Sequence, residues 1–181
     1  SLLAEGVRDG AAARAASDQL YTERGGKVSS TLNILSADLQ SQTIVIARNS
    51  RCPVFIAQGD RIECLSGDSS PIGTSRNIKP AITEIALSGQ ITVVMYTDGV
   101  LFAGDRYGQA MDICTLLESL LDEQDPSSQS VADTLLTHAI RLDQNRPNDD
   151  MSVVVLRVLP RNPDVIRRMT VRLPVGPADP I

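Results

Sequence analysis

Two strongly apolar segments of the chain each adjoin acidic residues, and this feature constrains the fold more than any other. Residues 91–97 (ITVVMYT) lead directly into Asp98, and Asp149 and Asp150 immediately precede residues 151–159 (MSVVVLRVL). Nearly continuous apolar runs of this length are typical of buried strands. If the two strands pair antiparallel, the end of the first lies beside the start of the second. The carboxylates then meet at one edge of a sheet.

Carboxylates that meet in this way repel each other unless a cation lies between them. Asp98 and Asp149 offer hard oxygen ligands, and the sequence has no cluster of His or Cys beside them. Such a ligand set suits Mg²⁺ or Mn²⁺. Gly99 allows a sharp turn of the backbone after Asp98. A second interpretation stays open on spacing alone, because Asp-Gly is a common turn dipeptide and Asp-Asp before a strand is often only solvated.

The remaining patterns predict an α+β fold with a mainly antiparallel sheet system. Helical spacing predicts helices over residues 9–24, 109–123 and 130–142. Short β-type runs predict strands over residues 28–38, 42–48, 53–58, 81–87 and 169–173, besides the two acidic-ended segments. Ser130 and Asp133 are placed to cap the last helix as a capping box. Short connections between successive strands imply antiparallel pairing, and residues 66–80 are turn-rich and predict a loop.

Composition narrows the class of protein. The 181 residues suit one domain, and with 42% apolar but only 3% aromatic residues the core must be aliphatic. A net charge of −5 without a Lys or Arg block argues against a nucleic-acid partner. No apolar run approaches the roughly 20 residues that span a bilayer, and no signal peptide opens the chain. Three cysteines without CxxC spacing fit small buried hydrophobic residues in a reduced, cytoplasmic location.

Several motifs, taken in order, resemble one known family. Residues 96–100 (YTDGV) and then 148–158 (NDDMSVVVLRV) resemble the paired signature of PPM-type (type 2C-like) protein phosphatases, in the bacterial branch typified by the stage II sporulation protein E. Residues 47–53 resemble that branch's strand ending in Asn before a Pro-led strand, and residues 70–73 resemble its Pro-x-Gly loop. Residues 4–10 (AEGVRDG) resemble its Ala-Asp-Gly-x-Gly-His-Gly motif before an Ala-rich helix.

The resemblance implies a four-layer α-β-β-α sandwich, in which two mainly antiparallel sheets are flanked by helices. The family's first strand pair would precede residue 4, so the expected domain over residues 1–160 lacks its N-terminal strands. Residues 161–181 are expected to form a C-terminal extension with one possible strand. An incomplete sandwich leaves strand edges unpaired, which favours a homodimer.

The resemblance also implies a site with two Mg²⁺ or Mn²⁺ ions. Asp98 and Asp149 match metal ligands, and Asp150 matches a weaker position beside Asp149. A metal-bound water or hydroxide attacks the phosphorus of phosphoserine or phosphothreonine in this family, so no further catalytic residue is expected.

The N-terminal motif departs from the family at its most important position. Glu5 stands where the family has its bridging Asp, and Gly6 matches a glycine whose carbonyl oxygen helps to bind metal. A second register aligns residues 7–10 (VRDG) with the motif and makes Asp9 the bridging ligand instead. We prefer Glu5, because that register keeps both glycines and the start of the helix in place.

The expected function is therefore a metal-dependent phosphoserine/phosphothreonine phosphatase, whose substrate is a bacterial regulatory protein of the anti-sigma-factor antagonist type. The alternative is a degenerate phosphatase fold that acts as an interaction module without turnover. A weaker reading is hydrolysis of another phosphate ester. Arg48, Arg51 and Arg76 are candidates for meeting a phosphate, although solvated faces explain them more simply. His138 is expected to be an ordinary helix residue.

Overall fold

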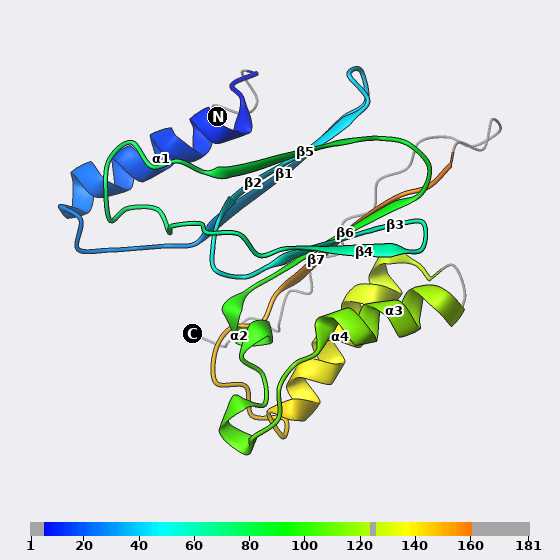
Figure 1. The fold of residues 1–181 in the computed structure, drawn as a ribbon. Coiled ribbons are helices and arrows are strands. Elements are labelled where there is room, and N and C mark those ends of the chain that lie inside the picture. The colour runs from blue at the N-terminus through cyan, green and yellow to red at the C-terminus, as the bar shows by residue number, and fades with distance from the viewer. Residues whose placement is uncertain (1–5, 124–125, 161–181) are drawn as a thin grey trace, which may run out of the picture.

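Two antiparallel sheets lie face to face in the computed structural model, which describes residues 6–123 and 126–160 (Figure 1). The first sheet has the order β1-β2-β5 and the second β4-β3-β6-β7. The strands are β1 (Leu32–Asp38), β2 (Thr43–Asn49), β3 (Val54–Gln58), β4 (Arg61–Leu65), β5 (Ala81–Ala86), β6 (Ile91–Tyr96) and β7 (Val153–Val158). All pairings between these strands are antiparallel, as the sequence predicts.

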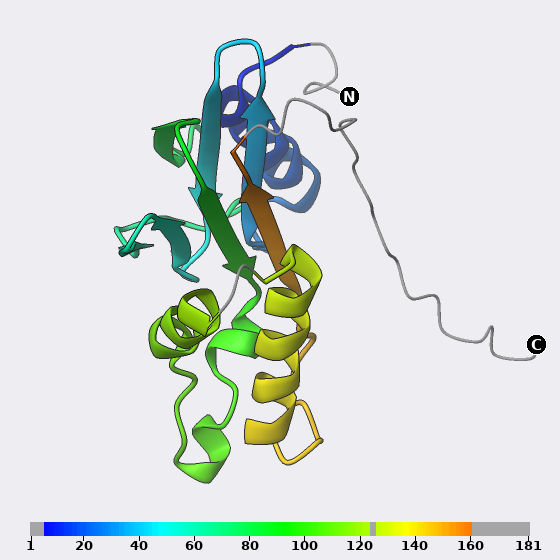
Figure 2. The same ribbon diagram turned by 90° about the vertical axis from the view of Figure 1, so that its right-hand side faces the viewer.

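Helices cover both outer faces of the sheet pair. Helix α1 (Asp9–Arg24) lies on the first sheet, and α3 (Ile113–Glu123) and α4 (Ser128–Leu142) lie together on the second (Figures 1 and 2). A short helix α2 (Asp98–Leu101) and a 3-10 turn (Asp105–Tyr107) connect β6 to α3. This arrangement confirms the predicted α-β-β-α sandwich. None of the helices in the described part of the chain is long and apolar enough to cross a membrane.

Strand β6 is buried along its whole length because it contributes to two cores. Ile91, Val93 and Met95 face the space between the sheets, while Val94 and Tyr96 face α3 and α4. Side chains of a strand alternate between its two faces, so a strand covered on both faces is mostly apolar, and the buried hydroxyl of Thr92 accepts a hydrogen bond from Arg157. This double coverage explains the continuous apolar run that the sequence shows.

Helix α1 approaches its sheet closely because its inward face is made of small residues. Ala12, Ala13 and Ser17 are buried there. The Ser17 hydroxyl accepts a hydrogen bond of 3.0 Å from the Gly73 amide. Gly73 has φ +89°, and a Cβ there would lie 2.5 Å from the Leu20 side chain and 2.6 Å from the Val28 carbonyl oxygen. Only glycine fits this position, which ties the loop after β4 to the helix.

The strand predictions need two corrections. Strand β4 is absent from the predicted strands, because it is an edge strand whose Arg and Glu residues interrupt the apolar pattern. The short connections from β2 to β3 and from β5 to β6 are not hairpins, since each carries the chain from one sheet to the other. The predicted strand over residues 169–173, like the whole extension over 161–181, lies outside the described residues.

The helix and cysteine predictions also need corrections. Helix α3 begins at Ile113 rather than at residue 109, because Asp112 accepts hydrogen bonds from the Thr115 amide and hydroxyl and so fixes the start. Helix α4 begins at Ser128, with Ser127 and not Ser130 as its cap. Among the cysteines, Cys52 is buried as expected, but Cys64 is exposed on β4.

Candidate functional site

The pairing of β6 with β7 brings the two acidic segments to one edge of the second sheet. The register ends with Tyr96 opposite Val153, and the Thr97 amide then donates to the Ser152 carbonyl oxygen at 3.0 Å. Asp98 therefore follows the last bonded position of one strand, and Asp149 and Asp150 precede the first position of the other. We call this edge, with Asp98, Asp149 and Asp150, the acidic rim. All three carboxylates are exposed.

Gly99 shows how closely the two segments approach each other. A Cβ at this position would lie 2.5 Å from the Asp150 carbonyl oxygen and 3.2 Å from that of Asp149. Such distances are shorter than any ordinary van der Waals contact, so a larger residue would push the segments apart. From the sequence we expect Gly99 to permit a sharp turn. In the structure, its lack of a side chain permits the backbones of the two acidic segments to pack against each other.

Thr97 links the same two segments through its side chain. Its hydroxyl donates to the Asp150 carbonyl oxygen at 3.0 Å and accepts from the Ser152 amide at 2.9 Å. The Asp150 amide in turn donates to the Asp149 carboxylate at 2.8 Å. No local pattern in the sequence points to Thr97, because a threonine at a strand end is common and its partners lie more than 50 residues away.

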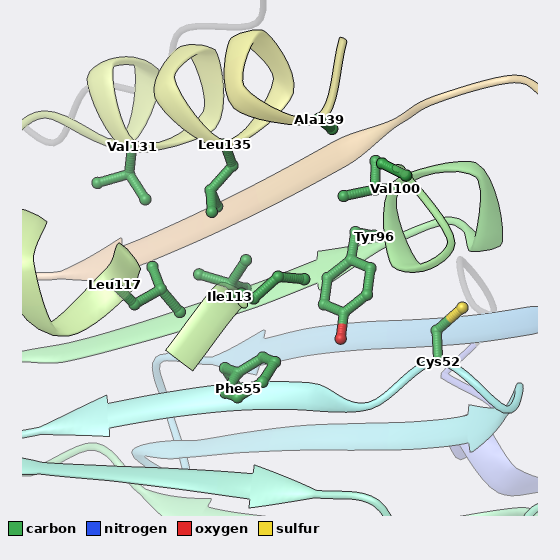
Figure 3. Close-up of a cluster of buried hydrophobic side chains, with 11 residues drawn as sticks. Cys52, Phe55, Tyr96, Val100, Ile113, Leu117, Val131, Leu135 and Ala139 are labelled. Carbon is green, nitrogen blue, oxygen red and sulfur yellow. The ribbon is translucent and has the colours of Figure 1, made fainter. Parts of the chain in front are cut away.

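The residues on either side of Asp98 are anchored in the helix-side core. Figure 3 shows Tyr96, Val100 and Cys52 among the buried side chains of this cluster. The rings of Tyr96 and Phe55 stack with centroids 6.2 Å apart. Burial raises the pKa of the Cys52 thiol. A hydrogen bond with the Ser50 side chain lowers this pKa, and the negative charge of the neighbouring Asp98 carboxylate raises it. Asp98 is thus an exposed carboxylate held between two buried residues of a rigid core.

A cleft of about 420 Å³ opens beside Asp98. It is lined by residues from four separate segments of the chain: Ser29, Ser30, Thr31, Ser50, Arg51, Cys52, Pro71, Asp98, Leu101 and Phe102. Of the three arginines considered from the sequence, Arg51 alone lines this cleft. Arg48 is buried and donates to the Gly67 carbonyl oxygen, and Arg76 lies over the Tyr21 ring. His138 lies on α4 and is not part of the lining.

The N-terminal candidates lie elsewhere. Glu5 falls outside the described residues, and Gly6 is exposed. Asp9 is 9% exposed in the first turn of α1, where its Oδ1 accepts a hydrogen bond of 2.9 Å from the Ser36 hydroxyl. At roughly 3.3 Å per residue, Ser36 lies about 16 Å along extended chain from Thr31 in the cleft. The structure therefore places the backbone of Asp98 beside that of Asp149 and Asp150, whereas the Asp9 carboxylate is bonded to strand β1 of the other sheet.

The chemistry of the acidic rim fits a hard divalent cation. Its donors are carboxylate oxygens, and Mg²⁺ is usually held by one or two carboxylates while it keeps several waters. Because these carboxylates are exposed, the folded protein does not lose stability by burying an unpaired charge before the ion binds. Within residues 6–123 and 126–160, no three His, Cys, Asp or Glu side chains gather closely enough to hold an ion by themselves. By itself the rim would therefore supply only part of a ligand set.

Comparisons with known proteins agree on the fold. The chain is 22% identical to a structure of the PP2C phosphatase domain and a fragment of the regulatory domain of SpoIIE from Bacillus subtilis, with a TM-score of 0.73 over 90% of this chain and 47% of that one. A manganese-presoaked structure of the SpoIIE phosphatase domain from the same organism matches at 20% identity, with a TM-score of 0.63 over 91% of this chain and 73% of that one. The architecture is therefore that of a PP2C-type phosphatase domain.

The sequence comparisons define the family. The model of the family "Stage II sporulation protein E (SpoIIE)" matches residues 1–159, and the chain belongs to this family. It is 26% identical over 158 residues to the stage II sporulation protein E of Bacillus subtilis (strain 168). That match covers 87% of this chain but only 19% of the relative, so the chain spans about a fifth of the relative's length.

Proposed function

We propose that this chain is the catalytic part of a metal-dependent phosphatase that acts on phosphoserine or phosphothreonine in a regulatory protein. The observation that carries the proposal is the acidic rim, where the β6–β7 register sets Asp98 beside Asp149 at the edge of a cleft. Family membership and the likeness to PP2C phosphatase domains support the same activity. By the same resemblance, the substrate is a regulatory protein of the anti-sigma-factor antagonist type.

In this proposal the carboxylates of Asp98 and Asp149 are ligands of the cation, and Asp150 supports Asp149. Gly6 and either Glu5 or Asp9 would complete the ligand set from the N-terminal motif. Bound Mg²⁺ or Mn²⁺ would neutralise charge on the phosphoryl oxygens and make water more acidic. The chain's own contribution is positioning: Thr97 and Gly99 fix the two acidic segments, and the rigid core behind Tyr96 and Val100 keeps Asp98 at the cleft.

A second candidate is a phosphatase fold that binds its partner without turning it over. The observation that favours it is the Glu at position 5, where the family has its bridging Asp. Such a module would still bind its partner in the cleft but would not bind the metal ion.

The test is phosphate release from p-nitrophenyl phosphate and from a phosphoserine protein, with and without Mn²⁺. Asp98→Ala and Asp149→Ala are compared with Asp122→Ala, which removes an exposed carboxylate from α3. The proposal predicts Mn²⁺-dependent turnover that both rim variants lose and the α3 variant keeps. Calorimetric titration with Mn²⁺ on the same proteins provides a readout that does not depend on turnover.

The two candidates predict different results. Absence of turnover together with absence of Mn²⁺ binding would refute the enzyme and favour the interaction module. Turnover that survives both rim substitutions would show that the acidic rim is not the site.

A further inference from the structure

The cleft beside Asp98 is lined by two chemically different groups of residues. The first, which we call the polar wall, carries hydroxyl groups and one arginine: Ser29, Ser30, Thr31, Ser50 and Arg51. The second, which we call the apolar wall, consists of Leu101 and Phe102 at the end of α2, and Pro71 adjoins the polar residues beside the Ser30–Ile72 bridge. Asp98 belongs to the same lining. A site that only had to hold an inorganic ion would not need an apolar wall, so the lining points to a larger ligand with a polar and an apolar part.

Arg51 is the charged group of the polar wall. It is exposed, and among the described residues its guanidinium has no hydrogen-bond or ion-pair partner. Arg48, three positions earlier, is buried and bonded to a backbone carbonyl instead. A guanidinium carries donors in a planar fork that matches the oxygens of a phosphate. Arg51 is therefore available to an anion that enters the cleft.

The loop that carries Arg51 is held by hydrogen bonds on both sides. The Ser50 amide donates to the Ser69 hydroxyl at 3.2 Å, and that hydroxyl donates to the Arg48 carbonyl oxygen at 2.6 Å. On the other side of Arg51, the Cys52 amide donates to the Ser50 hydroxyl at 3.1 Å. A fixed backbone reduces the entropy that a binding side chain loses, so Arg51 is preorganised for recognition.

Phe102 stands on the apolar wall and is fixed relative to Asp98. Its side chain is 57% exposed, although an aromatic ring of this size is usually covered. Its amide donates to the Asp98 carbonyl oxygen at 2.9 Å, which closes the short helix α2. The position of the ring therefore depends on the same helical turn that holds the acidic residue.

We propose that the cleft binds a phosphorylated segment of a protein substrate, with Arg51 on the phosphate and Phe102 on an apolar side chain next to the phosphorylated residue. The proposal rests on the phosphatase function proposed above and names how that site selects its substrate. The positive charge of Arg51 is complementary to a phosphate dianion, and the neighbouring apolar wall is complementary to a protein segment. Both residues are specificity determinants, whereas Asp98 and Asp149 remain the candidate ion ligands.

The binding test uses fluorescence anisotropy with labelled phosphoserine peptides in EDTA, so that neither metal nor turnover contributes. One peptide has leucine beside the phosphoserine, a second has glycine there, and a third has unphosphorylated serine. We expect Arg51→Gln to weaken binding of both phosphopeptides about tenfold, because a charge-assisted contact is lost. Phe102→Ala should weaken the leucine peptide severalfold and leave the glycine peptide unchanged. The unphosphorylated peptide should bind poorly to every protein.

Two control variants make the same chemical changes away from the cleft. Arg61→Gln removes an exposed arginine at the β3–β4 turn, and Leu39→Ala removes an exposed apolar side chain after β1. Neither should alter binding. All four substituted side chains are exposed, and thermal melting followed by circular dichroism checks that each variant is folded.

Kinetics with Mn²⁺ separate this inference from the proposed activity. With a phosphopeptide substrate, Arg51→Gln and Phe102→Ala should raise KM severalfold, and the control variants Arg61→Gln and Leu39→Ala should leave it unchanged. The inference is overturned if the wild type does not bind phosphopeptide in EDTA, or if Arg51→Gln binds it as tightly as the wild type. Binding through Arg51 without any turnover would instead refute the enzyme and leave the recognition site standing.

Discussion

The acidic rim and the first turn of α1 both contain candidate metal ligands, but the carboxylates of the rim are exposed to solvent and that of Asp9 in the first turn is buried. At the rim, Asp98 and Asp149 are exposed on a backbone that strand register and the Thr97 hydroxyl hold in place. At the first turn of α1, Asp9 is buried, one carboxylate oxygen is bonded to Ser36, and the other has no partner among the described residues. The first arrangement is open to an ion and the second is closed around its carboxylate.

This difference separates two uses of an acidic residue. A carboxylate that binds an exchangeable ion must keep its solvent access until the ion arrives, because burial without a partner is costly. A carboxylate at a helix N-terminus can stabilise the helix through the macrodipole without any ion. From this comparison we propose that the ion binds at the rim and that Asp9 has a structural role, and each prediction below tests one part of that proposal.

The largest expected effect distinguishes the two regions directly. Asp149→Asn should lower Mn²⁺-dependent phosphatase activity about 100-fold, which corresponds to ~2.7 kcal/mol of transition-state stabilisation. Asp9→Asn should change activity less than about threefold but lower stability by roughly 1–2 kcal/mol, since a charge-assisted bond to Ser36 is weakened. Steady-state kinetics and urea unfolding measure both. Equal losses of activity with unchanged stability would place Asp9 among the ligands and end the distinction.

The next effect tests the close contact that forms the rim. Gly99→Ala places a Cβ 2.5 Å from the Asp150 carbonyl oxygen, so we expect a loss of about 1–3 kcal/mol in unfolding free energy. Mn²⁺ affinity should fall with it, because the acidic segments move apart. Gly67→Ala is the matched control, since its Cβ would meet only the Arg48 guanidinium at 3.8 Å. If Gly99→Ala behaves like this control, the two segments are not in close contact in solution.

A smaller effect concerns the side-chain link at the rim. Thr97→Val keeps the shape of the residue but removes the hydroxyl that joins Asp150 to Ser152. We expect a loss of about 1 kcal/mol in stability and a severalfold loss in Mn²⁺ affinity. Thr137→Val on the exposed side of α4 should change neither quantity. Loss of stability without any change in Mn²⁺ affinity would show that the link serves the sheet alone.

The smallest effect compares one exposed carboxylate from each half of the molecule. Backbone amides of Gln40 and Ser41 lower the pKa of Asp38, and the Thr115 amide and hydroxyl lower that of Asp112. Each group therefore stabilises the fold above its ordinary pKa of 3.8, and the contribution is lost as the pH falls through the lowered value.

Asp38→Asn and Asp112→Asn should each lower the melting temperature slightly at pH 7, and both differences from the wild type should shrink as the pH falls below the ordinary pKa of 3.8. Melting curves across this range provide the measurement. A difference that persists at acid pH would mean that the carboxylate charge is not its source.

Much of this molecule could be predicted from the sequence, for reasons that differ between fold and site. The antiparallel meeting of Asp98 and Asp149 follows from two apolar strands with acidic ends, and the structure confirms that pairing. The sandwich came from the resemblance of motifs to a family. The crossings between sheets after Asn49 and Ala86 could not be predicted, because a short connection looks the same whether it joins neighbours or changes sheets.

The parts of the site that escaped prediction depend on contacts between distant segments. Thr97 has no local signature, since it acquires its role only when a distant segment folds against it. Arg51 is one of three arginines that the sequence offers for a phosphate, and only the packing of separate loops around the cleft distinguishes it from Arg48 and Arg76. The edge strand β4 was missed because its charged residues suit solvent rather than a core. The metal roles of Glu5, Gly6 and Asp9 stay predictions, and Asp9→Asn tests that of Asp9.

The double burial of β6 has a consequence for how the molecule unfolds. Val93 belongs to the core between the sheets and Val94 to the core beneath the helices, so neither core can come apart while the other keeps the strand in place. We expect a single cooperative transition, with the β6 amides the last to exchange with deuterium. Asp98 follows the last residue of that strand directly. The acidic rim would therefore be lost only when both cores unfold together.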